Sequence, residues 1–169
     1  MEKVTIDEVA NFPWAAETIR RLSEPLGAEH VVVNHYELEN GDSFAFAYHS
    51  HEFQEEVFII LDGTATFETD AGEVHVGSGE AIRFEPGEFQ RGWNHGDERV
   101  VALVLGAPRA YGNEQRLRMC DDCAGMRHHD LEVREENHVP GGRVIVAICA
   151  DCHAVNGEWS EGSMPGEVP

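Results

Sequence analysis

Between residues 30 and 107, short apolar runs alternate with turn-forming residues, and this pattern limits the chain to a few kinds of fold. HVVVNHYEL ends at ENGD, EVFIILDG ends at a glycine, and TATFETDAGEVHV contains two short runs joined by DAG. Strands that recur with turn signals about every 8–12 residues favour an antiparallel sandwich or barrel. We therefore expect an all-β fold over this region.

The segments on either side of this region differ from it. Residues 15–27 form either a short helix ended by Pro25 and Gly27 or a surface loop. After APRAYGNEQ, polar residues become more frequent and all four cysteines follow. The length of 169 residues suits either one medium domain or one domain with a small appendage. We place the boundary near residue 113, with a first domain over 1–112 and a second over 113–169 that ends in a flexible tail.

The charge balance is strongly acidic, with 32 acidic against 12 basic residues and a formal net charge of −20. Lys3 is the only lysine. This profile resembles proteins of extremely halophilic archaea, and the alternative is an ordinary acidic protein. No basic stripe is visible, so we expect no nucleic-acid partner. The apolar runs are too short to span a bilayer, and acids stand where a signal peptide would be apolar, which favours a cytoplasmic protein without a membrane partner.

His49 and His51 lie two residues apart in YHSHEFQEEVFIILDG, residues 48–63. On a strand, both side chains project to the same face. Glu56 can add an anionic oxygen from the next strand or turn. Two histidines and one carboxylate on one side of a metal are the set associated with non-haem iron. The alternative is a pair of exposed histidines on a polar strand edge.

The spacing of these residues resembles the two sequence signatures of the cupin family. The first is His49-Ser50-His51, four residues, Glu56, six residues, Gly63; the second is Gly79, five residues, Glu85-Pro86-Gly87, two residues, Gln90, three residues, Asn94. The resemblance implies a double-stranded β-helix (cupin or jelly-roll) barrel. It also implies a divalent transition metal in the barrel mouth, either iron, manganese, zinc or nickel.

Gln90 departs from the cupin pattern, because the family usually places its third histidine there. A glutamine offers a carbonyl oxygen, which is a harder and weaker ligand than imidazole. Three outcomes are open: Gln90 is a weak fourth ligand, it hydrogen-bonds a metal-bound water or substrate, or the site holds metal poorly. Four nearby residues are either substrate contacts or ordinary packing and surface residues: Tyr36, Arg83, Trp93 and Asn94.

The four cysteines occur in two tight pairs, CDDC at 120–123 and CADC at 149–152, with 25 residues between them. Four thiolates can bind one structural zinc in a closed tetrahedral site, formed by Cys120, Cys123, Cys149 and Cys152. The intervening segments predict a two-stranded hairpin, and this layout resembles a zinc ribbon. Disulfides are disfavoured in a cytoplasmic chain, and a redox pair would need only one such motif. The neighbouring His128, His129 and His153 are redundant as ligands, so we expect them at the surface.

The resemblance to cupins implies a mononuclear-metal enzyme, dioxygenase-like or isomerase-like, that acts on an unknown small molecule. The alternative is a regulatory module that senses a small ligand, with the zinc ribbon contacting a protein partner. The glutamine at position 90 favours this alternative, and a cupin fold alone cannot decide, because one fold hosts many functions. Small cupins often form dimers through their sheets, so the resemblance also implies a homodimer.

Overall fold

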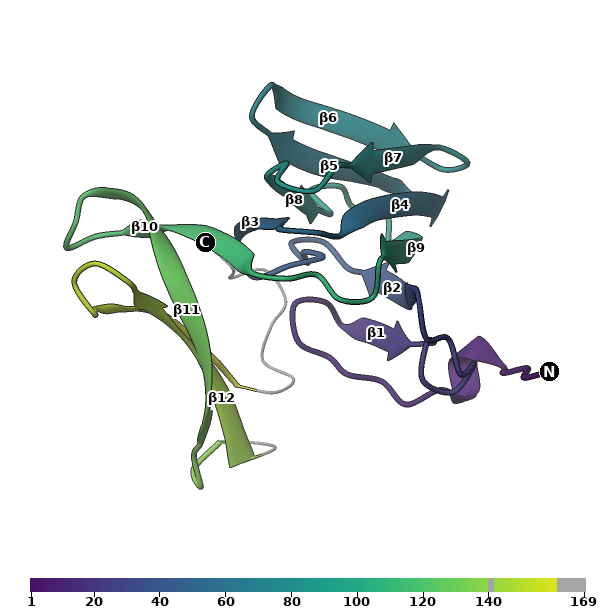
Figure 1. Ribbon diagram of the computed structural model, residues 1–169, viewed down its shortest axis with the longest axis horizontal. Helices are drawn as coiled ribbons and strands as arrows, with labels where there is room; N and C mark the ends of the chain where they lie inside the picture. The colour runs from purple at the N-terminus through teal and green to yellow at the C-terminus, as the bar shows by residue number, and fades with distance from the viewer. Residues whose placement is uncertain (140–141, 161–169) are drawn as a thin grey trace.

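The computed structural model describes residues 1–139 and 142–160, and the tail predicted over 161–169 lies outside them. In this part of the chain the strands form two antiparallel sheets, and the helical structure is a short 3₁₀ turn, η1 (Ile6–Glu8) (Figure 1). The all-β prediction is therefore confirmed. The strands are β1 (Thr18–Arg21), β2 (Val32–Leu38), β3 (Tyr48–His51), β4 (Glu55–Asp62), β5 (Thr64–Thr69), β6 (Gly72–Gly77), β7 (Ala81–Phe84), β8 (Gln90–Trp93), β9 (Val100–Ala107), β10 (Glu114–Cys120), β11 (Gly125–Glu135), β12 (Arg143–Cys149) and β13 (Val155–Ser160).

The first sheet has the order β1-β2-β9-β4-β7. In its central strand, β9, every second residue is buried, as the alternation of a strand with one covered face requires. Val100, Ala102 and Val104 on this face join the main hydrophobic core. The sheet therefore turns one apolar face toward the second sheet.

Strand β1 corrects the expectation of a helix or a surface loop over residues 15–27. It pairs antiparallel with β2, and Ile19 lies opposite Tyr36. The backbone N–H of Ile19 also donates to the side-chain oxygen of Asn11 at 2.8 Å. Thr18 and Ile19 are β-branched and suit an extended backbone. The sequence pattern did not reveal that β2 offers a partner for this segment.

The core between the two sheets is largely aromatic. Phe44, Phe58, Phe67 and Phe84 form a continuous cluster whose contacting ring centroids lie 4.9 to 5.9 Å apart. Gly92 of β8 lies against this cluster, since a Cβ atom built on it would come within 2.6 Å of both Phe67 and Phe44. Packing beneath the Phe44–Phe67 stack therefore requires a glycine at this position.

The second sheet continues from the barrel into the cysteine-bearing strands, in the order β13-β12-β11-β10-β3-β8-β5-β6. The predicted hairpin between the cysteine pairs is present as β11 and β12, and Leu131 lies opposite Ala147. Strands β10 and β13 flank this hairpin, which the sequence did not predict. Strand β10 also pairs with β3, with Glu114 opposite His51 and Arg116 opposite His49. Backbone pairing thus joins the cysteine strands, called the ribbon strands below (β10 to β13), directly to the barrel.

Side-chain packing adds to this connection. Ile145, Ala147 and Trp159 of the ribbon strands form a second buried cluster, against which Trp14, Phe46 and Trp93 of the barrel pack. The Arg118 guanidinium donates to the Phe46 carbonyl and lies over the Trp159 ring at 4.6 Å. Burial lowers the pKa of Arg118 to about 10.

No helix in the described part of the chain is long and apolar enough to cross a membrane.

Candidate metal centre

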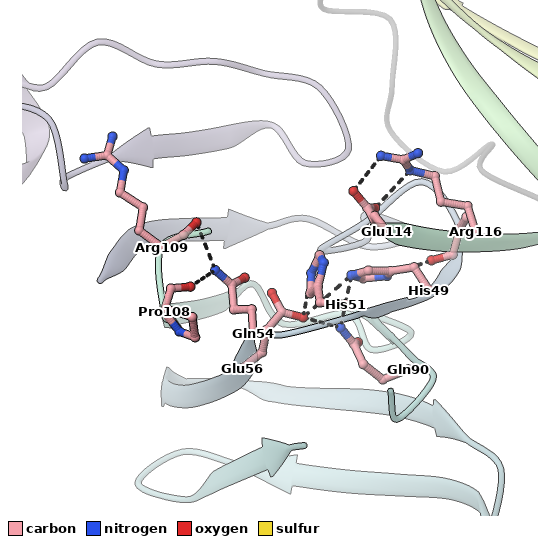
Figure 2. A network of polar contacts seen from close by, with 10 residues as sticks. His49, His51, Gln54, Glu56, Gln90, Pro108, Arg109, Glu114 and Arg116 are labelled. Carbon is pink, nitrogen blue, oxygen red and sulfur yellow. Dashed lines mark hydrogen bonds and ion pairs between the residues drawn. The ribbon is translucent and has the colours of Figure 1, made fainter. Parts of the chain in front are cut away.

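Strands β3 and β4 bring three of the expected ligands together (Figure 2). Glu56 Oε2 lies 3.6 Å from His49 Nε2 and 3.4 Å from His51 Nε2. One donor atom from each of the three side chains lies within 4.8 Å of the others. Donors bound to one metal at about 2.1 Å lie about 3 Å apart, so small side-chain rotations suffice for a shared ion. The three residues lie on two strands that follow one another in the chain, which explains why their spacing in the sequence could indicate the triad.

A backbone contact sets the orientation of the His49 ring. His49 is buried, and its Nδ1 lies 3.1 Å from the carbonyl oxygen of Ala47. That carbonyl can only accept, so Nδ1 carries a hydrogen, and the lone pair of the neutral ring is then on Nε2. Nε2 is the atom that faces Glu56. This arrangement is the one that metal-binding histidines use, because the second nitrogen is held by a backbone acceptor.

The charges of the triad stabilise one another. Burial alone would lower the pKa of His49, but the hydrogen bond and the charge of Glu56, together with the charge of Glu114, outweigh it and raise that pKa. Burial alone would raise the pKa of Glu56, but the hydrogen bonds and charges of His49 and His51 lower it to about 2. Glu56 is therefore an ionised carboxylate, and a neighbouring positive charge stabilises it in this buried position.

Gln90 of β8 completes the set, because it is paired with His49 across the two strands. It is 1 % exposed, and its Nε2 donates to Glu56 Oε2 at 2.9 Å. Its Oε1 atom is buried and has no hydrogen-bond partner among the described residues. The oxygen and nitrogen of an amide exchange places by a half-turn of the side chain, and this turn would direct the lone oxygen at the triad. The donor set thus fits a divalent metal with two imidazoles, one carboxylate and one amide oxygen.

The surroundings of the triad contain residues that sequence reasoning did not identify. Glu114 and Arg116 form a two-bond ion pair, at 2.9 and 2.5 Å, beside the two histidines (Figure 2). Gln54 is held in place by a hydrogen bond of 2.7 Å to the Pro108 carbonyl. Strand pairing and loop packing between segments far apart in the sequence bring these residues to the site. No local sequence motif indicates that they lie there.

The four other residues considered from the sequence have different positions. Tyr36 is half-buried against the core of the barrel, where burial and the charge of Glu56 raise its pKa. Arg83 is paired with Glu55 and Glu85 at the surface. Trp93 lies beneath the Arg91 guanidinium at 3.6 Å. Asn94 is fully buried and its amide donates to the Leu38 and Glu98 carbonyls, which makes it a structural residue.

The four cysteines also converge, because β10–β11 and β12–β13 place one CxxC motif at each of two turns. Their sulfur atoms all lie within 4.8 Å of one another. The Sγ atoms of Cys120 and Cys152 are 3.5 Å apart, and those of Cys123 and Cys149 are 4.0 Å apart. A tetrahedral zinc with Zn–S bonds of about 2.3 Å places its sulfurs about 3.8 Å apart. All four are free thiols, so the group has the composition and size of a closed zinc site.

His129 corrects the expectation that the histidines near the cysteines lie at the surface. It is 3 % exposed. Its Nδ1 lies 2.9 Å from the Arg127 carbonyl and its Nε2 lies 2.9 Å from the Asn156 side-chain oxygen. Both ring nitrogens are therefore used to fix the ribbon strands. His128 is exposed, as expected.

A family model described as Cupin domain matches residues 34–106. This range contains the whole His49–His51–Glu56–Gln90 set. The match, together with the fold of the solved structures described next, supports a cupin-type domain over this part of the chain. No curated protein sequence matches the chain.

Solved cupin-fold structures resemble this one at low identity. The polyketide cyclase RemF from Streptomyces resistomycificus is 25% identical over 72% of this chain and 89% of its own, with a TM-score of 0.61. A sugar phosphate isomerase of the cupin superfamily from Silicibacter pomeroyi is 19% identical over 96% of this chain and 95% of its own, with a TM-score of 0.58. A predicted oxalate decarboxylase from Thermotoga maritima is 19% identical over 63% and 98%, with a TM-score of 0.55. These similarities establish the double-stranded β-helix fold.

Proposed function

We propose that this protein is a metal-dependent enzyme that acts on a carbonyl group of a small molecule, as an isomerase or a cyclase. The barrel holds one divalent transition metal through His49, His51 and Glu56, with Gln90 as the fourth ligand. The observation that carries the proposal is the convergence of the three donor atoms around a His49 ring whose Nδ1 is held by a backbone carbonyl. Two of the similar structures are named as a sugar phosphate isomerase and a polyketide cyclase, which supports this reaction class over an oxygenase.

When bound, the metal supplies a Lewis acid that polarises a substrate oxygen. The residues of the chain prepare the site for it. Glu56 remains a carboxylate, because its pKa is lowered to about 2. Gln90 supplies a neutral oxygen, so that the ligand set carries a single negative charge. Tyr36 keeps its phenolic proton, because its pKa is raised by burial and by Glu56, and it can donate a hydrogen bond to a substrate oxygen.

The cysteine group binds a structural zinc in this proposal. Its four thiolates leave no open position for substrate. The zinc joins the turn between β10 and β11 to the turn between β12 and β13. Its role is to hold the four ribbon strands against the barrel, because a unit this small has little core of its own.

Metal content and metal affinity test the proposal. We expect protein purified without chelator or nickel resin to contain about one zinc and about one further transition metal per chain. Titration of metal-stripped protein with Mn²⁺ should give one barrel site, and His49→Ala should weaken it by more than about tenfold, since even an outer partner of a ligand is worth about 10–100-fold. His30→Ala is the matched control, because His30 is an exposed histidine outside the site.

A small-ligand sensor, with the ribbon strands contacting a protein partner, is the second candidate. Gln90 favours it, since its Nε2 already satisfies Glu56 with a hydrogen bond of 2.9 Å and no ion is needed for that contact. Zinc alone, with no Mn²⁺ binding, would support this sensor and contradict the metal-dependent enzyme. Turnover that is lost in His49→Ala while the melting temperature is kept would exclude the sensor.

A further inference from the structure

A cleft of about 420 Å³ lies between the barrel and the ribbon strands. Its volume suits a small organic molecule. The barrel contributes five aromatic side chains to its lining: Phe12, Trp14, Tyr36, Phe44 and Phe46. The ribbon strands contribute Val133, Arg143 and Ile145. The cleft therefore needs both parts of the chain to exist.

The position of the ribbon wall follows from the sheet register. Val133 of β11 lies opposite Ile145 of β12, so both project from the same face of the second sheet. Ile145 belongs to the cluster that packs on Trp14 and Phe46. The wall is thus fixed to the barrel by buried contacts, in addition to the pairing of β10 with β3.

Two arginines give the cleft a charge opposite to that of the protein as a whole. Arg21 and Arg143 both line it and both are exposed. Among the described residues, Arg21 has no carboxylate within ion-pair distance, and its guanidinium lies over the Phe12 ring at 4.9 Å. The chain has 32 acidic residues against 12 basic ones, so a cationic group beside an aromatic lining and away from any described carboxylate is unusual in it. Guanidinium groups recognise carboxylate, sulfonate and phosphate groups through paired hydrogen bonds.

One residue that lines the cleft lies near the metal centre. Tyr36 lines the cleft, and it lies close enough to Glu56 for the charge of that carboxylate to raise its pKa. Phe46 lines the cleft as well, and the next residue, Ala47, holds the His49 ring through its carbonyl. The four expected metal ligands are not among the residues that line this cleft, and His51 lines a separate hollow of about 330 Å³.

We propose that this cleft binds a flat, largely apolar organic anion, and that the ribbon strands form one wall of the binding site. The apolar body packs on the aromatic side chains, and the anionic group lies at Arg21 and Arg143. This binding preference goes beyond the proposed function and does not rest on it. The ribbon strands thereby act in ligand recognition within the same chain.

Fluorescent probes test the cleft without knowledge of its natural ligand. Anilinonaphthalene sulfonate is a flat aromatic anion, and phenylnaphthylamine is its uncharged counterpart. Both are titrated at the lowest salt concentration that leaves the circular-dichroism spectrum unchanged. We expect the anionic probe to bind at one site per chain and Arg21→Gln to weaken it by about tenfold, as loss of a charge-assisted hydrogen bond does. The neutral probe should bind Arg21→Gln and wild type equally.

A second pair of variants tests the ribbon wall. Val133→Trp should weaken both probes, because the indole occupies the cleft from the ribbon side. Val155→Trp is the matched control, since Val155 is an exposed valine of the ribbon strands that does not line the cleft. Val133 is itself 61% exposed, so the larger side chain does not disturb the core. Equal probe affinity in these two variants would overturn the role of the ribbon strands.

The outcomes separate this inference from the proposed function. If probe binding depends on Arg21 and Val133 in protein that never takes up a barrel metal, the cleft is supported as a binding site. The proposal of a metal-dependent enzyme is then contradicted. If the barrel contains a metal but Arg21→Gln binds the anionic probe as tightly as wild type, the proposed function is supported. The preference of the cleft for an anion is then overturned. Probe binding that rises in proportion to the unfolded fraction would overturn the cleft altogether.

Discussion

Gln90 is the residue at which this barrel departs most from the cupin pattern. Its side chain is as buried as the core residues, yet half of its amide has no partner in the described structure. A buried polar atom without a partner destabilises the folded state, so coordination of an ion by that oxygen would stabilise the site. An amide oxygen is also a harder donor than imidazole, which favours manganese or iron over zinc and copper. In the proposed metal centre, this single side chain would therefore influence both the affinity for the ion and the preference among metals.

Replacing Gln90 with histidine should strengthen the centre. The imidazole would face His49 across β3 and β8 and supply a third nitrogen donor. We expect Gln90→His to bind Ni²⁺ at least about tenfold more tightly than wild type, measured by calorimetry on metal-stripped protein. Gln90→Leu has a similar size and no donor, and should bind more weakly than wild type. Equal affinities for all three proteins would mean that position 90 does not contact the ion.

The metal-free triad should give a defined dependence of stability on pH. Glu56 has a lowered pKa, so its contribution is present above its unfolded value of 4.5 and is lost as the pH falls toward about 2. His49 has a raised pKa, so its contribution is present below 6.5 and is lost as the pH rises through the raised value. We expect the free energy of unfolding lost in Glu56→Gln to be largest between about pH 4.5 and 6.5. Urea unfolding in chelator across pH 3–9 measures it, and a difference that is flat with pH would contradict the ion network.

At the residue scale, the sequence predicts the residues that lie close together in the chain. The spacing of His49, His51 and Glu56 follows from strand alternation and one turn, and the structure brings these residues together. Tyr36 could be considered only as one of several candidates, because its position beside Glu56 depends on the packing of β2 in the barrel. Glu114 and Arg116 could not be predicted at all. They approach the histidines through the pairing of β10 with β3, and no local pattern carries that information.

At the scale of elements, β8 shows how a short strand can position the site. It contains only Gln90–Trp93, and its four residues take part in three different sets of contacts. Gln90 faces the triad, Arg91 lies over Trp93, and Gly92 lies beneath the Phe44–Phe67 stack. The close approach at Gly92 brings β8 near the aromatic core. The position of Gln90 therefore depends on the absence of a side chain two residues later.

Gly92→Ala should destabilise the barrel and disturb the metal centre together. The added methyl group would lie 2.5 Å from Phe67 and 2.6 Å from Phe44, so the strand or the rings must move. Overpacking of this kind costs about 1–3 kcal/mol, measured by denaturant unfolding. Gly77→Ala is the matched control, because the nearest atom to its added methyl group is 3.5 Å away. A stability loss equal in the two variants would show that the aromatic stack tolerates the methyl group.

The elements that the sequence predicts are those with a clear apolar run or a clear turn signal, such as β4, β9 and the β5–β6 hairpin. The two strands that it did not predict, β10 and β13, are rich in polar and charged residues. They are strands because their neighbours in the sheet pair with them. The segment that contains β1 was also misjudged, since its alanines and charged residues suit a helix as well as a strand. In each case tertiary pairing decided a segment whose own preference was weak.

At the scale of the whole molecule, the dominant feature is the net charge of −20. The carboxylates cover the surface, while the arginines that line the cleft or pack on tryptophans are concentrated between the barrel and the ribbon strands. Repulsion among the carboxylates favours a more expanded chain. We therefore expect the folded protein to depend on ions in its solvent more than a neutral protein of this size would.

Salt should stabilise the protein over a wide range of concentration. The Debye length falls from about 10 Å at 0.1 M salt to about 3 Å at 1 M, so repulsion between neighbouring carboxylates is progressively screened. We expect the melting temperature to rise monotonically with KCl from about 0.1 to 2 M. Sucrose at matched osmolality separates this effect from general exclusion of solute. A melting temperature that rises equally in sucrose would remove charge repulsion as the cause.

The pairing of β10 with β3 has one further consequence, for any attempt to divide the chain. A cut at residue 112 would appear to release an intact barrel, since the family match ends at residue 106. It would instead strip the neighbour from β3 and leave the backbone of Tyr48–His51 as an open sheet edge. Open edges recruit strands from other molecules, and this one carries both histidines of the metal centre. The shortened barrel would therefore be prone to self-association at the strand on which its chemistry depends.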